Sequence, residues 1–156
     1  MPDRDAPAAA AAPISLLTQD GYSIAARLYT CTGAVRARLI VAGATGVPQS
    51  FYQAFAEFAA SHGYETLTLD YRGIGLSKTS TLKGYEMDYL DWAYQDLAAA
   101  IDYWHSDGYP AGIWQGVDID PAALGLKGIG HMGYFRRQAQ PLWRDALAWF
   151  EHSPAA

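Results

Sequence analysis

The chain has 156 residues, of which 51% are hydrophobic and 17% charged, and its formal net charge is -5. This size and composition indicate one packed globular protein and exclude a disordered chain. The negative charge gives no reason to expect a nucleic-acid or anionic-membrane partner, so we expect neither. No segment reaches the roughly 18 uninterrupted apolar residues of a membrane span, so we expect no membrane association.

The cysteine and histidine contents limit the chemistry. Cys31 is the only cysteine, which excludes an internal disulfide and fits a reducing, cytoplasmic compartment. The four histidines do not recur at the i, i+4 spacing of metal ligands, so we expect no metal site, and we expect no cofactor. Residues 1–12 contain acidic residues, prolines and an alanine run, and we interpret them as a disordered leader. Residues 13–152 then form a single domain.

The first predicted elements are extended. Residues 14–18 and 22–30 flank the pair Asp20-Gly21, and an Asp-Gly pair between two apolar runs predicts a β-hairpin. Residues 36–42 (RARLIVA) end in β-branched and small side chains before Gly43, which is typical of a buried strand.

A helix and another strand follow this segment. Pro48 suits the first turn of a helix, and apolar residues then recur at helical spacing as far as the expected left-handed cap at Gly63. Residues 64–70 (YETLTLD) predict the next strand. Strand, helix and strand within about 35 residues predict a βαβ unit with parallel strands.

The remaining predicted elements are two helices and a short strand. Asp88 and Asp91 favour the start of a helix over residues 88–105. Its predicted apolar face is formed by Leu90, Ala93, Leu97, Ile101 and Trp104. Residues 113–119 predict one more strand, interrupted by Gly116. Residues 141–151 predict a closing helix whose apolar positions are Leu142, Ala146, Trp149 and Phe150.

Three segments resemble the α/β-hydrolase fold, and more narrowly its bacterial serine-hydrolase and esterase-like branch. LIVAGATGVPQSFY (39–52) resembles the third strand of that fold running into the oxyanion loop, with Ala42-Gly43 where His-Gly is common. LDYRGIGLS (69–77) resembles the Asp-x-Arg-Gly-x-Gly-x-Ser signature that follows the fourth strand. LGLKGIGHMGYFRR (124–137) places His131 where the family has its histidine base. The resemblance implies a shortened α/β sheet of about five strands, an N-terminal hairpin plus a βαβ unit, and about three helices.

The nucleophile of this family is missing from the sequence. In the family it lies on a G-x-S-x-G elbow after the fifth strand, and the triad follows the order Ser, Asp or Glu, His. No G-x-S-x-G occurs in the 156 residues, and the nearest imitation is Gly75-Leu76-Ser77-Lys78-Thr79. At roughly 30 residues per βαβ unit, the usual eight strands do not fit. We therefore interpret the chain as an internally shortened, truncated hydrolase.

The resemblance implies two site residues. His131 is the expected general base, and Asp118 or Asp120 could contact it, although neither matches the acid of the family. The backbone N–H of Ala44 is the expected oxyanion donor, and the alternative is a tight turn without a catalytic role. The segment lacks the Lys-Ser/Thr of a phosphate-binding P-loop. Arg72, Gly73 and Gly75 are interpreted as structural, with the arginine bridging to a carboxylate or a carbonyl.

Two functions remain open. The first is a serine ester or acyl hydrolase scaffold, impaired or inactive as it stands, whose substrate if active is a small ester. The second is a non-catalytic pseudoenzyme that serves as a self-association or binding module. Loss of the fifth strand leaves the apolar strand at 36–42 on an open edge. We expect residues 113–119 to pair there, or a second copy of the chain to form a homodimer.

Overall fold

The computed structural model describes residues 10–79, 86–106 and 133–152. The chain divides into two compact units, Met1–Tyr109 and Pro110–Ala156, and each is described by itself. The interpretation of residues 13–152 as one domain stays a prediction.

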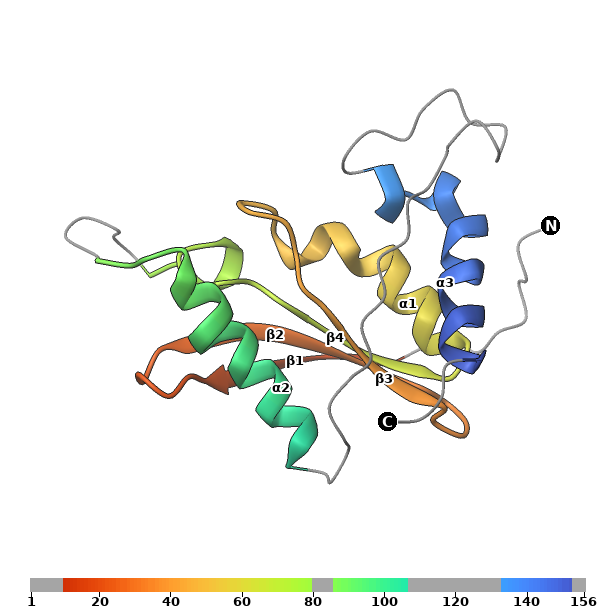
Figure 1. The fold of residues 1–156 in the computed structure, drawn as a ribbon, viewed down its shortest axis with the longest axis horizontal. Coiled ribbons are helices and arrows are strands. Elements are labelled where there is room, and N and C mark those ends of the chain that lie inside the picture. Colours follow the sequence, from red (N-terminus) through yellow and green to blue (C-terminus); the bar gives the residue numbers. More distant parts are fainter. Residues whose placement is uncertain (1–9, 80–85, 107–132, 153–156) are drawn as a thin grey trace. The chain divides into compact units, whose positions relative to one another are not determined.

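The first unit is built on a mixed four-stranded sheet (Figure 1). Its strands are β1 (Ala10–Leu17), β2 (Ser23–Thr30), β3 (Ala37–Val41) and β4 (Tyr64–Leu69), in the order β1-β2-β4-β3. β1 and β2 are antiparallel, β2 and β4 are antiparallel, and β3 and β4 are parallel. Within the described residues the sheet has four strands rather than about five, and the strand predicted at 113–119 lies outside those residues.

The predicted hairpin is confirmed, but its first strand begins earlier than expected. Gly21 has a φ of 85° in the turn, which suits glycine. β1 pairs with β2 over its whole length, from Ala10 opposite Thr30 to Leu17 opposite Ser23. The prediction of a disordered leader is therefore wrong for residues 10–12, because these residues complete the antiparallel ladder. Residues 1–9 lie outside the described part of the chain.

The predicted helix between β3 and β4 is also present. It opens with the 3₁₀ turn η1 (Gln49–Tyr52) and continues as α1 (Gln53–Ser61). Phe55 and Phe58 are buried, as their spacing predicts, and Gly63 ends the segment with a φ of 91°. α1 covers one face of the sheet, where Ala56 and Ala60 pack with Tyr29.

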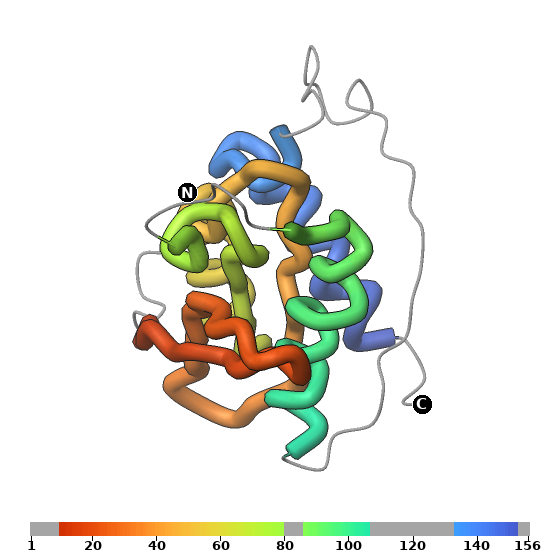
Figure 2. Tube along the Cα trace, turned by 90° about the vertical axis from the view of Figure 1, so that its left-hand side faces the viewer, coloured from red at the N-terminus to blue at the C-terminus, as the bar shows by residue number. Residues whose placement is uncertain are grey.

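The opposite face of the sheet is covered by a helical stretch made of the π-helical segment η3 (Trp92–Leu97) and α2 (Ala98–His105). Figure 2 shows η3 and α2 on the other side of the strands from α1. The stretch is preceded by a reciprocal cap, in which the Leu90 N–H donates to the Asp88 carboxylate and the Asp88 N–H donates to Asp91.

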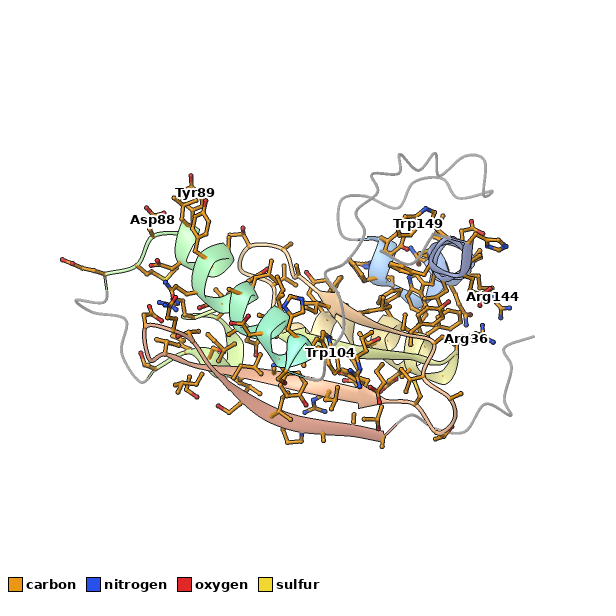
Figure 3. All side chains as sticks on the ribbon, turned by 60° about the horizontal axis from the view of Figure 1, so that its bottom comes forward. Arg36, Asp88, Tyr89, Trp104, Arg144 and Trp149 are labelled. Atoms are coloured by element: carbon orange, nitrogen blue, oxygen red, sulfur yellow. The ribbon has the colours of Figure 1, made fainter. Side chains whose placement is uncertain are left out.

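The predicted apolar face of this stretch is wrong in part. Trp104 is buried, but Leu90 is 43% and Ile101 is 39% exposed, while Asp96 is fully buried. The wider π turn rotates the first half of the stretch against the second, so helical spacing across it misplaces the buried side. Figure 3 shows Asp88 and Tyr89 at the outer start of the stretch and Trp104 at its far end.

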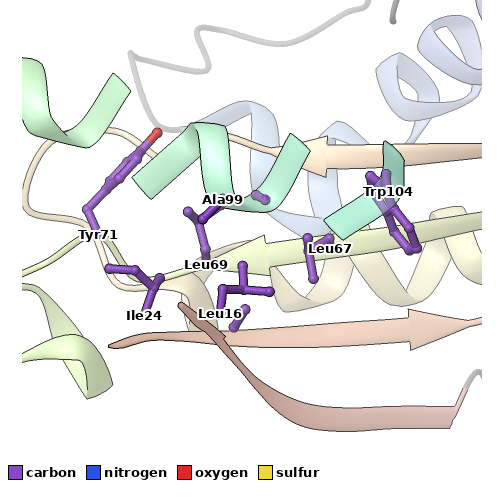
Figure 4. Packing of buried hydrophobic residues seen from close by; sticks show 9 residues of the cluster. Leu16, Ile24, Leu67, Leu69, Tyr71, Ala99 and Trp104 are labelled. Atoms are coloured by element: carbon purple, nitrogen blue, oxygen red, sulfur yellow. The ribbon is translucent and has the colours of Figure 1, made fainter. Parts of the chain in front are cut away.

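The main core lies between the sheet and α2. Side chains from β1, β2, β4 and α2 meet there, as Figure 4 shows. Its buried members are Leu16, Ile24, Ala26, Leu67, Leu69, Tyr71, Ala99, Ala100 and Trp104. Burial of these groups away from water provides the main driving force for docking α2 on the sheet. Leu67 and Leu69 fix the end of β4 in this core, and the loop that supports the candidate site follows directly from that end.

The second unit contains the short turns η5 (Gly133–Phe135) and η6 (Arg137–Ala139) and the helix α3 (Gln140–His152). The indole N–H of Trp143 donates to the Tyr134 carbonyl over 2.5 Å and ties η5 to the helix. The predicted closing helix is confirmed. Of its predicted apolar positions Leu142 is buried, and Trp143 and Leu147 join it.

Candidate active site

Of the two predicted site residues, the structure describes Ala44 alone. His131 lies outside the described residues, as do Asp118 and Asp120. The expected roles of His131 and Ala44 both stay predictions. The site is therefore built from the loop after β3 and from the loop after β4, which supports it.

The loop after β3 closes as a tight turn. The Val47 N–H donates to the Ala44 carbonyl over 3.0 Å, and Gly46 has a φ of 75°. The left-handed conformation explains why glycine stands at position 46. The turn holds Ala44 just beyond the carboxyl end of β3, where the resemblance places an oxyanion donor.

The Ala44 N–H is engaged by a phenol. It donates to the Tyr52 hydroxyl oxygen over 2.6 Å, and Tyr52 is only 1% exposed. Gly43 makes this contact possible, because a Cβ atom there would lie 2.9 Å from Cε2 of the Tyr52 ring. A buried hydroxyl oxygen thus already accepts the N–H that the resemblance assigns to an oxyanion. Sequence reasoning missed Tyr52, because the contact arises only when the first helical turn folds back onto the loop.

Asp70 links this loop region to the loop after β4. Its carboxylate accepts the Gln49 backbone N–H over 2.6 Å, the Gln49 side-chain amide over 3.1 Å and the Leu76 N–H over 2.9 Å. The neighbouring backbone approaches so closely that a Cβ on Gly75, whose φ is 48°, would lie 2.5 Å from Asp70 Oδ2. The carboxylate therefore fixes the start of η1 and the turn η2 (Gly75–Ser77) together.

Ser77 is a structural serine. Its hydroxyl donates to the Asp70 carbonyl over 2.5 Å and accepts the Ala25 N–H over 2.8 Å. The Tyr22 hydroxyl donates to the Ser77 carbonyl over 2.6 Å. The Ser77 hydroxyl thus spans two backbone groups inside the fold, which explains the serine of the signature without assigning it a nucleophilic role.

Arg72 holds together three separate segments. Its Nε donates to Asp96 over 2.7 Å, and its terminal nitrogens donate to Asp20 over 2.6 and 3.0 Å. The Arg72 backbone N–H also donates to Asp96, and the Arg72 carbonyl accepts the indole N–H of Trp92 over 3.2 Å. The interpretation of Arg72 as a bridge to a carboxylate is confirmed. The clamp joins the hairpin turn, the loop after β4 and the π-helical segment.

Burial and charge act differently on the two carboxyls of this clamp. The hydrogen bond from Arg72 holds the pKa of Asp20 well below its usual range. Burial raises the pKa of Asp96, whose side chain is fully buried, although Arg72 acts against that rise. The hydrogen bond to Asp20 raises the pKa of Arg72, so the guanidinium remains charged. The arrangement is that of a buried ion pair that orders the loop.

The described residues contain no group of three or more His, Cys, Asp or Glu side chains that could hold a metal ion. In the same parts of the chain, no helix combines the length and the apolar character needed to cross a membrane.

Comparison with solved structures shows the fold class. A structure of DcsB in complex with its substrate analogue shares 28% identity at a TM-score of 0.50, over 62% of this chain and 32% of that one. The α/β hydrolase GrgF from a Penicillium species shares 21% identity at a TM-score of 0.52, over 63% of this chain and 33% of that one. A hypothetical protein from Pseudomonas aeruginosa shares 20% identity at a TM-score of 0.51, over 64% of this chain and 31% of that one.

The sheet order and these likenesses identify the chain as having the α/β-hydrolase fold. The chain spans about a third of the length of the solved structures that it resembles. No family model and no curated protein sequence matches it.

Proposed function

We propose that the chain is a serine ester or acyl hydrolase scaffold that does not hydrolyse esters as it stands. The observation that carries this proposal is the hydrogen bond between the Ala44 N–H and the buried Tyr52 hydroxyl. An oxyanion hole needs free donors about 2.7–3.1 Å from the developing negative charge. Here the donor offered by the loop after β3 already has an acceptor, and the sequence contains no G-x-S-x-G to supply a nucleophile and a second donor.

A fluorophosphonate probe and a p-nitrophenyl ester test this proposal directly. We expect no serine labelling, and turnover equal to that of the His131→Ala variant, because no hydroxyl is activated for attack. A full-length serine hydrolase treated in parallel checks that the probe is reactive. Labelling of a defined serine that is lost in His131→Ala would overturn the proposal.

A second candidate is a non-catalytic module that associates with itself through the β3 edge. The observation that favours it is the strand order, in which β3 pairs with β4 and forms the edge of the described sheet. Open strand edges pair readily with other strands. Sedimentation velocity over a dilution series tests this candidate, which requires a dimer whose population rises with concentration.

We also propose that the chain is an internally shortened hydrolase that acts in the cytoplasm, since its single cysteine fits a reducing compartment. Sequencing of the surrounding gene tests the first part, because an uninterrupted longer reading frame with a G-x-S-x-G elbow would show that this chain is a truncated product and not the product of an internally deleted gene. Cell fractionation tests the second part.

A further inference from the structure

Tyr71 lies at the same edge of the sheet as the candidate oxyanion loop. Val41 on β3 pairs with Thr68 on β4 in the parallel register, and Ala44 and Tyr71 each come three residues after that pair. The carboxyl ends of neighbouring parallel strands meet at one edge of an α/β sheet, and ligands of such sheets bind there. Tyr71 is therefore placed where a ligand is expected.

The backbone and the ring of Tyr71 are held in place. Its carbonyl accepts the Ile74 N–H over 2.9 Å. The ring stacks on the Trp92 indole, with the centroids 5.3 Å apart and the planes 18° from parallel. The Trp92 indole is itself tied to the Arg72 carbonyl. The orientation of the Tyr71 ring is thus fixed before a ligand arrives, which lowers the entropy cost of binding.

The Tyr71 hydroxyl is a polar group on an otherwise buried ring. The residue is 8% exposed, and Figure 4 shows the hydroxyl pointing away from the other labelled members of the core. Within residues 10–79, 86–106 and 133–152 it makes no hydrogen bond, although a buried tyrosine usually finds a partner for its O–H. Unlike the indole nitrogen of Trp104, its oxygen is not fully enclosed. A ligand atom can therefore reach it.

The surroundings of this hydroxyl select the chemistry of the ligand. Burial, the Asp96 carboxylate and the Tyr52 phenol raise the pKa of Tyr71, so the hydroxyl keeps its proton at neutral pH and acts as a donor. The negative charge of Asp96 also disfavours an anion at the same place. The partly buried Ile74 and Trp92 pack against the core around Tyr71. A ligand that fits has an apolar body and a neutral acceptor oxygen.

We propose that the Tyr71 hydroxyl donates a hydrogen bond to the carbonyl oxygen of a neutral, largely apolar ligand bound at the carboxyl ends of β3 and β4. The inference rests on the proposed function, because a scaffold that does not cleave esters can still hold a carbonyl compound. Tyr71 is then a binding residue, and no covalent bond is made or broken. Mostly apolar ligand sites use a few such polar groups to fix the orientation of the ligand.

The test uses 2-heptanone, a ketone that cannot be hydrolysed, and measures its dissociation constant from amide shifts in ¹⁵N-correlated NMR spectra. Tyr71→Phe removes the hydroxyl and keeps the ring that stacks on Trp92. We expect this variant to bind about 2- to 10-fold more weakly, the value of one neutral hydrogen bond. Tyr89→Phe is the matched control, since Tyr89 is 73% exposed, and it should bind as the unaltered chain does. Equal dissociation constants in the two variants would overturn the proposal.

Two measurements on the unaltered chain do not depend on the folding of a variant. The largest amide shifts should fall in the loops that contain Ala44 and Tyr71, and heptanoate, which carries a negative charge, should bind more weakly than the ketone. Absence of binding, shifts confined to other parts of the chain, or tighter binding of heptanoate would each overturn the proposal.

Infrared spectra report the contact itself. The carbonyl band of ¹³C-labelled 2-heptanone should lie at a lower frequency when bound to the unaltered chain than when bound to Tyr71→Phe, because a hydrogen bond weakens the C=O bond. A purely structural role of the hydroxyl would leave this band in place and would contradict the proposal. Turnover of a p-nitrophenyl ester would refute the proposed function and leave ketone binding unaffected, so the two fail separately.

Discussion

The loop after β4 and the region around β3 differ in how their buried polar groups find hydrogen-bond partners. After β4, the chain buries Asp70, Arg72 and Asp96, and the polar side chains meet partners from the hairpin, η1 and η3. At β3, the Ala44 N–H is matched only by a phenol and the Trp104 indole has no acceptor in the described residues. In the first region these polar side chains find partners within the described chain, whereas in the second one buried donor, the Trp104 indole N–H, has none among the described residues.

The largest loss of stability is expected when the clamp formed by Arg72, Asp20 and Asp96 is broken. Arg72→Leu leaves the fully buried Asp96 carboxylate without its cation, and removal of one partner of a buried pair costs about 3–5 kcal/mol of unfolding free energy. Arg38→Leu is the matched control, because its pair with Glu65 is partly exposed and should cost about 1 kcal/mol. Urea unfolding monitored by tryptophan fluorescence measures both. Equal losses would mean that the two regions do not differ as described.

A steric comparison separates close packing from backbone strain. Gly75→Ala and Gly46→Ala both place a side chain at positive φ, which costs about 1–2 kcal/mol. A Cβ at Gly75 would also meet the Asp70 carboxylate, whereas nothing lies within 4 Å of one at Gly46. We expect Gly75→Ala to be about 1–3 kcal/mol less stable than Gly46→Ala in thermal or urea unfolding. A reversed order would contradict the packing around Asp70.

The phenol contact at the candidate oxyanion loop predicts a smaller effect. Tyr52→Phe removes the acceptor of the Ala44 N–H, so we expect a loss of about 0.5–1.5 kcal/mol and faster hydrogen exchange at Ala44. Tyr94→Phe is the control, since Tyr94 is 73% exposed. Unchanged exchange at Ala44 in Tyr52→Phe would show that the amide is held by another group.

The smallest effect concerns acid stability. The pKa of Asp20 is lowered by Arg72, so the ionised carboxylate stabilises the fold above the ordinary value of about 3.9 and loses that contribution as the pH falls below it. Because the Asp20 side chain is 41% exposed, we expect less than about 1 kcal/mol.

The carboxyls of Asp20 and Asp96 change the stability of the fold in opposite directions as the pH rises. Burial raises the pKa of Asp96, so its contribution falls as the pH rises from the ordinary value to the raised one. In the Asp20→Asn variant, the unfolding free energy should therefore fall less steeply at acid pH, while the contribution of Asp96 stays in place. An acid limb identical to that of the unaltered chain would argue against the Asp20 to Arg72 pair.

Local sequence signals predicted the framework well. Asp20-Gly21 predicted the hairpin, Gly63 the helix end, and the apolar runs at 36–42 and 64–70 the parallel pair. Each of these depends on neighbouring residues and on backbone conformations that few residue types adopt. The fold class followed because the signals occur in the right order.

Local sequence signals did not predict the contacts of the candidate site. Asp96 lies 24 residues after Arg72, and no spacing rule connects a loop arginine to a helical aspartate so far along the chain. The Ala44 to Tyr52 contact needs a 3₁₀ turn that folds back on the loop. Helical periodicity likewise failed across residues 92–97, since it presumes a constant number of residues per turn.

The π-helical segment makes the length of this helix as important as its composition. A π turn holds one residue beyond the α-helical count, so deletion of a single residue within 92–97 would restore a regular helix and swing everything before it by about 100°. Asp96 would leave the guanidinium of Arg72, and Trp92 would leave its stack on Tyr71, where the ring centroids lie 5.3 Å apart. Natural variants of this chain should therefore tolerate substitutions in the exposed turns far better than a one-residue gap here.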